Sequence, residues 1–138
     1  MKKIEDTFKL LSDGTRLRIL MLLDRNELCV CQLMAILGVS QPLVSRNLSL
    51  LARGGFLEDR REGKLVFYRA SQRLDHIHKK VYDCVKEVLQ DDETVRNDKG
   101  TLVECTEMQK QTGRCDMETL RDFMERKRKG MAGKRGLR

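Results

Sequence analysis

The sequence has few aromatic residues, a single proline and no long apolar run. Only 4% of its 138 residues are aromatic and none is Trp, which argues against a platform for stacking bases or an aromatic cage for a cationic ligand. No stretch approaches the roughly 20 apolar residues that a membrane-spanning helix needs. The opening MKKIEDTFKL also lacks the apolar core of a secretion signal. We therefore expect a cytoplasmic protein with no membrane partner.

Charge and cysteine content narrow the function further. Lys and Arg number 28 against 21 Asp and Glu, a net charge of +7, and this balance favours a polyanionic partner such as nucleic acid. Five cysteines in a chain without an export signal indicate reduced thiols that serve metal binding, redox chemistry or core packing.

The composition divides the chain near residue 92. We expect residues 1–92 to form the folded domain and residues 93–138 to form a basic C-terminal extension with two cysteines, partly helical or disordered. The extension ends in RKRKGMAGKRGLR, and such a run is usually solvated and disordered. A helical pattern begins at Asp116.

The spacing of apolar residues in the first part predicts helices followed by a hairpin. We expect helices over 3–11, 15–24, 27–37, 41–53 and 71–90, and strands over 56–60 and 65–69. Asn26 and Ser40 are the expected caps of the third and fourth helices, and Gly38 ends the third. The predicted fold class is mainly α with a small β-hairpin, in the order of a homodimeric winged helix-turn-helix.

The fourth predicted helix is the candidate recognition helix. Small polar groups and one arginine line its outer side, where they could contact base edges and phosphates; these are Ser40, Gln41, Ser45, Arg46 and Ser49. We expect its other side, with Leu43, Val44, Leu48 and Leu51, to face the core. The hairpin adds Arg60, Arg61, Lys64 and Arg69, and residues 40–73 contain seven basic and three acidic residues. This excess of positive charge supports phosphate binding.

An apolar stripe on the last predicted helix suggests self-association. Its members are Ile77, Val81, Cys84, Val85 and Val88. Together with the first helix it is interpreted as a dimer face, which would double the area buried on DNA. Ordinary packing within one chain is the alternative.

The most informative chemistry is the pair Cys29 and Cys31 at the start of the third predicted helix. Residues two apart do not face each other on a regular helix, so binding of one ion would open its first turn and act on the recognition helix that follows. We expect the helix N-terminus to lower the thiol pKa, and soft thiolates select soft ions over Mg²⁺ or Ca²⁺. The alternatives are two buried small residues and a redox pair. A thiol enzyme is disfavoured because the chain lacks CxxC and has no His near the pair.

Several motifs, in the same order, resemble those of the ArsR (ArsR/SmtB) repressor family. The matching segments are FKLLSD at 8–13, TRLRIL at 15–20, ELCVCQL at 27–33, SQPLVSRNL at 40–48, GGFL at 54–57, RREGK at 60–64 and VFY at 66–68. The resemblance covers about residues 4–90. It implies a homodimeric repressor that binds the operator DNA of a resistance operon and leaves it when As(III) or Sb(III) binds, with no organic cofactor. A transition-metal or redox-responsive repressor of the same fold is the alternative.

The resemblance also assigns individual residues. Cys29 and Cys31 match the arsenic-binding thiols. Asn47 is a further candidate DNA contact, in the recognition helix where the family usually has His. Arsenic sensors of the family often have a third cysteine where this chain has Met34, and a thioether is a weak ligand. No cysteine precedes Cys29, which argues against the cadmium and lead branch.

The source of a third thiolate is left open by the sequence. Cys84 is interpreted as core or dimer packing. Cys105 and Cys115 lie in the extension, which could fold back and supply a ligand, form a second site, or carry both cysteines incidentally.

Overall fold

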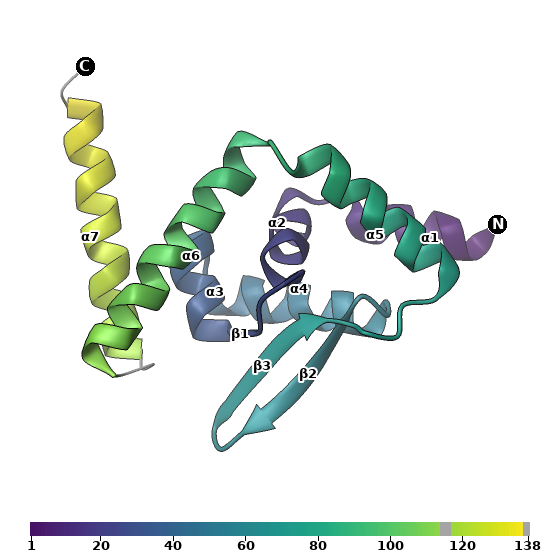
Figure 1. Ribbon diagram of the computed structural model, residues 1–138, viewed down its shortest axis with the longest axis horizontal. Helices are drawn as coiled ribbons and strands as arrows, with labels where there is room; N and C mark the ends of the chain where they lie inside the picture. Colours follow the sequence, from purple (N-terminus) through teal and green to yellow (C-terminus); the bar gives the residue numbers. More distant parts are fainter. Residues whose placement is uncertain (114–116, 137–138) are drawn as a thin grey trace.

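The computed structural model describes the backbone of residues 1–113 and 117–136. Within them the chain forms seven helices and three strands (Figure 1). In order these are α1 (Lys2–Leu11), α2 (Gly14–Leu23), β1 (Leu28–Cys29), α3 (Val30–Leu37), α4 (Gln41–Arg53), β2 (Leu57–Glu62), β3 (Leu65–Ala70), α5 (His76–Leu89), α6 (Glu93–Thr112) and α7 (Met117–Gly136).

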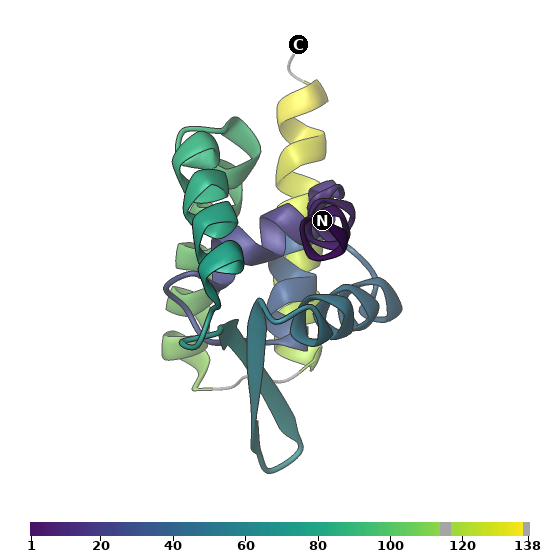
Figure 2. The ribbon, with the colours of Figure 1, turned by 90° about the vertical axis from the view of Figure 1, so that its right-hand side faces the viewer.

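The winged helix-turn-helix expected from the sequence is confirmed. Helices α3 and α4 are separated by three residues, the first of which, Gly38, has φ of 68°. That left-handed conformation favours glycine and ends α3. Strands β2 and β3 form an antiparallel hairpin whose turn contains Gly63, with φ of 62°. The hairpin projects from the helical body beside α4 (Figure 2).

The core lies where α2, α3 and α4 meet. Its fully buried residues include Ile19 and Leu20 of α2, Leu33 of α3, Leu48 of α4, and Phe56 just before the hairpin. Their burial fixes the relative positions of α3 and α4, and therefore the direction in which the candidate recognition helix points.

The sequence prediction was wrong about the start of the third helix. Asn26 does not cap α3; its side-chain amide donates to the Leu22 carbonyl oxygen at 2.8 Å and so closes α2. Helix α3 begins at Val30, and the two residues before it form β1. This short strand pairs antiparallel with β3, giving a three-stranded sheet in the order β1-β3-β2. Helix α5 likewise begins at His76 rather than at residue 71, after the cap Asp75.

The C-terminal extension folds back onto the first part of the chain. Helix α6 packs against α2 and α3 and buries Val95, Asp98 and Cys105. Helix α7 packs against α3 and buries Leu120 and Phe123. The basic C-terminal run, expected to be disordered, continues α7 to Gly136.

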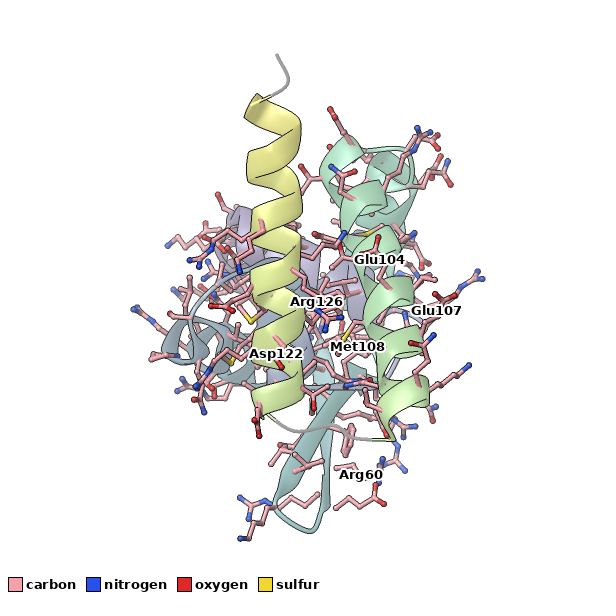
Figure 3. The ribbon with its side chains drawn as sticks, turned by 90° about the vertical axis from the view of Figure 1, so that its left-hand side faces the viewer. Arg60, Glu104, Glu107, Met108, Asp122 and Arg126 are labelled. Atoms are coloured by element: carbon pink, nitrogen blue, oxygen red, sulfur yellow. The ribbon has the colours of Figure 1, made fainter. Side chains whose placement is uncertain are left out.

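Contacts between the two helices complete this layer. Met108 of α6 and Arg126 of α7 lie between them (Figure 3). Lys127 of α7 pairs with Glu104 of α6, with Nζ 2.6 Å from Oε2.

A buried ion pair anchors α6 to the helix-turn-helix. The Arg18 guanidinium donates to both carboxylate oxygens of Asp98, from Nε at 2.9 Å and from Nη2 at 2.8 Å. The Asp98 side chain is only 5% exposed, and a carboxylate buried to this extent needs such a partner to offset its loss of hydration. The paired carboxylate raises the pKa of Arg18. The Asp98–Arg18 pair therefore makes the extension part of the folded core.

Replacing Asp98 by Asn should destabilise the protein by about 1.5–3 kcal/mol, the usual contribution of hydrogen bonds to charged groups. Urea unfolding measures this loss, and hydrogen exchange should show α6 opening more often. The control is Asp91→Asn, because the Asp91–Arg96 pair is exposed at 78% and 66% and such pairs contribute little. Equal stability of the two variants would contradict the anchoring role.

Candidate DNA interface and thiol site

The outer side of α4 presents the polar groups expected from the sequence. Ser40, the N-cap, and Gln41, Arg46 and Ser49 are exposed, and Ser45 is partly exposed. Val44, Leu48 and Leu51 are buried beneath them. A helix with small polar residues and one arginine outward is suited to a major groove.

One prediction for this helix was wrong, because Leu43, expected in the core, is 42% exposed. Asn47, a candidate DNA contact, is only 4% exposed. Asn47 Oδ1 accepts a hydrogen bond from Arg16 Nη1 at 3.2 Å, and Arg16 Nε donates to the Leu10 carbonyl oxygen. Asn47 therefore fixes α4 to α2 and α1. Leu43 places an apolar group on the outer side, where it could contact a thymine methyl.

The wing divides its basic residues between two roles. Arg61 and Lys64 are exposed at the tip of the hairpin and form no ion pair with any described residue. Arg69, in contrast, pairs with Glu58 at 2.6 Å. Only the first two retain unpaired charge for phosphates.

Arg60, like Arg69, forms ion pairs within the protein. Its Nε donates to Glu27 Oε1 at 3.0 Å and its Nη1 to Glu62 Oε2 at 2.9 Å, and these carboxylates raise its pKa. Its guanidinium also lies over the Phe67 ring, 4.9 Å from the centroid. Arg60 thus connects the wing to the segment that leads into Cys29.

Cys29 lies at the junction between strand and helix. Its backbone is extended, with φ of −90° and ψ of 169°, and it is the N-cap of α3. It pairs with Phe67 of β3, and its amide donates to Gln32 Oε1 at 2.9 Å. Cys31 lies one residue inside the helix and is partly buried. The expectation that both thiols sit on a regular helix was therefore wrong, because Cys29 precedes it.

The pKa of Cys31 also differs from the expectation. Burial raises the pKa of the Cys31 thiol, and the neighbouring Cys29 raises it further by its charge and by a side-chain hydrogen bond. The predicted lowering by the helix N-terminus does not occur at Cys31. Desolvation dominates because Cys31 lies close beneath the surface of a packed junction rather than at an open helix end.

A third thiol comes close to this pair. Cys105 of α6 is 1% exposed; burial, and then the charge of Cys29, raise its pKa to about 11. Gln32 Nε2 donates to Gln109 Oε1 at 2.9 Å, one helical turn beyond Cys105. Cys105 thus belongs to the part of α6 that contacts α3, within range of the charge of Cys29.

The other cysteines lie apart from this cluster. Cys84 is an exposed thiol on α5 rather than a core residue, and Cys115 lies outside the described residues. Among the residues that the structure describes, no three His, Cys, Asp or Glu side chains already stand in position to hold a metal ion.

Comparison with known proteins agrees with this architecture. Residues 13–59 match the family described as bacterial regulatory protein, arsR family. The chain is 46% identical over 88 residues to the arsenical resistance operon repressor of Escherichia coli, covering 60% of this chain and 75% of the relative. The chain belongs to the ArsR family. It is also 44% identical to the arsenic resistance transcriptional regulator ArsR1 of Pseudomonas putida, covering 62% of this chain and 70% of that one.

Solved structures of other proteins show the same fold. HlyU from Vibrio cholerae, 30% identical, superposes with a TM-score of 0.57 over 65% of this chain and 95% of that one. The homodimeric winged helix-turn-helix DNA-binding domain of a possible ArsR-family regulator from Mycobacterium bovis, 29% identical, superposes with a TM-score of 0.55 over 67% and 82%. The ArsR family consists of DNA-binding regulators, not enzymes. In the described part of this chain, no helix combines the length and apolarity needed to cross a membrane.

Substitutions at Arg46 and Asn47 should have different effects, one on DNA binding and the other on the stability of the fold. Arg46→Ala should weaken operator binding by about 1–3 kcal/mol, the range for a base-contacting arginine, without changing the unfolding free energy. Asn47→Ala should lower that free energy by about 1–3 kcal/mol, because it leaves Arg16 without a buried acceptor. Fluorescence anisotropy and urea unfolding measure the two effects. If Asn47→Ala were fully stable but unable to bind DNA, Asn47 would be a contact residue after all.

Proposed function

We propose that this ArsR-family member is a transcriptional repressor that binds operator DNA as a homodimer and releases it when As(III) or Sb(III) binds cysteine thiols. Metal-responsive repression is supported by the family and by relatives whose names refer to arsenical resistance, SmtB and cadmium resistance. The single observation that carries the proposal is the thiol pair at the β1–α3 junction, which lies between the wing and the helix-turn-helix.

In the DNA-bound form, α4 would occupy the major groove. Ser40, Gln41, Ser45 and Ser49 would offer hydroxyl and amide groups, and Arg46 would contact a base edge or phosphate. Arg61 and Lys64 at the wing tip would contact the backbone of the adjacent groove. Arg60 and Asn47 would hold these elements in place without contacting DNA.

The donor set fits a soft, thiophilic inducer. Cys29 and Cys31 present sulfur, and no carboxylate of the described residues completes a hard-cation site around them. When bound there, trivalent arsenic or antimony would supply strong bonds to sulfur. The residues that would hold it first are Cys29 and Cys31.

Inducer binding would be coupled to DNA release through the junction. Cys29 pairs with Phe67, and Phe67 in turn pairs with Arg60 across the sheet. Drawing the two sulfurs together would change the backbone at Cys29 and thus the pairing of β1 with the wing. It would also shift the start of α3, which is connected to α4 by three residues. Both elements that face DNA would therefore lose their relative orientation.

Arsenite should release the dimer from operator DNA, and Cys31→Ser should prevent release without weakening DNA binding in its absence. Cys29→Ser should behave in the same way. Fluorescence anisotropy of labelled operator DNA measures both steps. The control is Met34→Leu, a substitution of similar volume at a thioether that the proposal leaves unused, so this variant should still respond. Release by peroxide or by a transition metal but not by arsenite would favour the alternative inducers.

The proposed dimer would form through α1 and α5. Phe8 of α1 is 60% exposed and Val88 of α5 is 72% exposed, and Lys3 of α1 pairs with Asp75 at the start of α5. The two helices lie at the end of the molecule opposite α7 (Figure 1). The homodimeric neighbour from Mycobacterium bovis supports association of this kind.

Val88→Asp should yield a monomer, because it buries a charge in the proposed interface. Operator affinity should then fall by about 100-fold or more, since two linked half-site contacts no longer reinforce each other. Sedimentation velocity measures the mass, and Val103→Asp on α6, at a valine that is 56% exposed, is the matched control. A Val88→Asp dimer would place the interface elsewhere.

A further inference from the structure

Cys105 is a buried thiol outside the pair formed by Cys29 and Cys31. It is 1% exposed and belongs to α6, which packs against α2 and α3. Two polar contacts fix this part of α6: the Asp98–Arg18 pair before Cys105 and the Gln109–Gln32 hydrogen bond after it. The second contact leads directly to the pair, because Gln32 also accepts from the Cys29 amide.

We propose that Cys105 is the third sulfur ligand of the inducer site, so that α6 closes a three-thiol site over Cys29 and Cys31. This inference rests on the proposed function. It gives the C-terminal extension a role in sensing, within the same chain.

The position three residues after Cys31 explains why a ligand from elsewhere is needed. Residues three apart share one side of a helix, but this position holds Met34, which packs against the core. A thioether is a much weaker ligand than a thiolate. Cys105 offers a thiol from α6, which packs against α3.

Three thiols match trivalent arsenic in stoichiometry. In the reaction with arsenous acid, three S–H bonds and three As–O bonds break and three As–S bonds form. The three thiol protons and the three hydroxides leave as three water molecules, and arsenic keeps its oxidation state. The thiols therefore need not be ionised in advance.

Closing this site requires movement, since the described residues do not yet hold three ligands in position. The junction at Cys29 must approach α6, or α6 must approach the junction. Because the Asp98–Arg18 pair restrains α6, the smaller part, the β1–α3 junction, is expected to shift. Binding to Cys105 would thus pull the junction away from the wing.

X-ray absorption at the arsenic edge, on the full-length protein with one equivalent of arsenite, tests the assignment. The wild type should show three sulfur neighbours, and Cys105→Ala should show two sulfurs and one oxygen. Arsenite affinity should fall by about 10- to 100-fold or more, since even removal of a supporting group around a metal site costs that much. The control Thr106→Ala, on the next residue of α6, should keep three sulfurs.

Phenylarsine oxide separates this inference from the proposed function. One bond of its arsenic is to carbon, so only two thiols can bind, and it should release DNA equally from the wild type and from Cys105→Ala. Three sulfurs in Cys105→Ala, or two in the wild type, would overturn the role of Cys105 alone. Failure of both arsenicals to bind the wild type would overturn the proposed function as well.

Two further variants distinguish the loss of a sulfur ligand from structural damage caused by the substitution at position 105. Cys105→Val preserves volume in the buried position and should also show two sulfurs, with operator binding unchanged. Adding Met34→Cys to Cys105→Ala should restore three sulfurs, because position 34 faces Cys31 along α3. A double variant that stays at two sulfurs while Cys105→Ala loses operator binding would indicate a structural role for Cys105 instead.

Discussion

The extended backbone of Cys29 is the constraint on which the other functional elements depend. In that conformation one residue can end a strand and cap a helix at the same time, so β1 and α3 are joined without a loop. The strand side places Cys29, Phe67 and Arg60 in a row across the three-stranded sheet. The helix side connects through α3 to α4. Any ligand that reorients Cys29 therefore acts on both DNA-facing elements, and no distant pathway is required.

Local rules were sufficient to predict most of the DNA-binding fold. The end of α3 at Gly38, the start of α4 after Ser40 and the hairpin turn at Gly63 depend on backbone preferences of single residues. Strand β1 could not be predicted in this way. It has two residues, too few for periodicity, and the Asn26 before it resembles a helix cap. Its existence depends on pairing with β3, a contact made nearly 40 residues later in the chain.

The sequence identifies the residues of the recognition helix, but it does not determine which of them face outward. The sequence places Leu43 and Asn47 on α4, but which of them faces outward depends on how α4 lies across α2. The hydrogen bond from Arg16 to Asn47 settles it, and that bond joins residues 31 apart. The number of basic residues in the wing likewise overstates the charge that is available to DNA. Arg60 forms ion pairs with Glu27 and Glu62, and Arg69 forms one with Glu58.

Helix α6 shows why the extension was difficult to predict and why it matters. Its inward side holds Val95, Asp98 and Cys105, and the charged Asp98 interrupts the apolar pattern. The buried carboxylate of Asp98 would oppose packing if it had no partner. Arg18 of α2 provides that partner and so allows α6 to pack. The polar residues that weaken the apolar pattern of α6 also form the contacts that dock this helix, and Cys105 lies between those contacts in the sequence. A helix docked only by apolar contacts could slide along α3, whereas the Arg18–Asp98 pair and the Gln32–Gln109 bond fix its register, and the thiol can serve as a ligand only if that register is fixed.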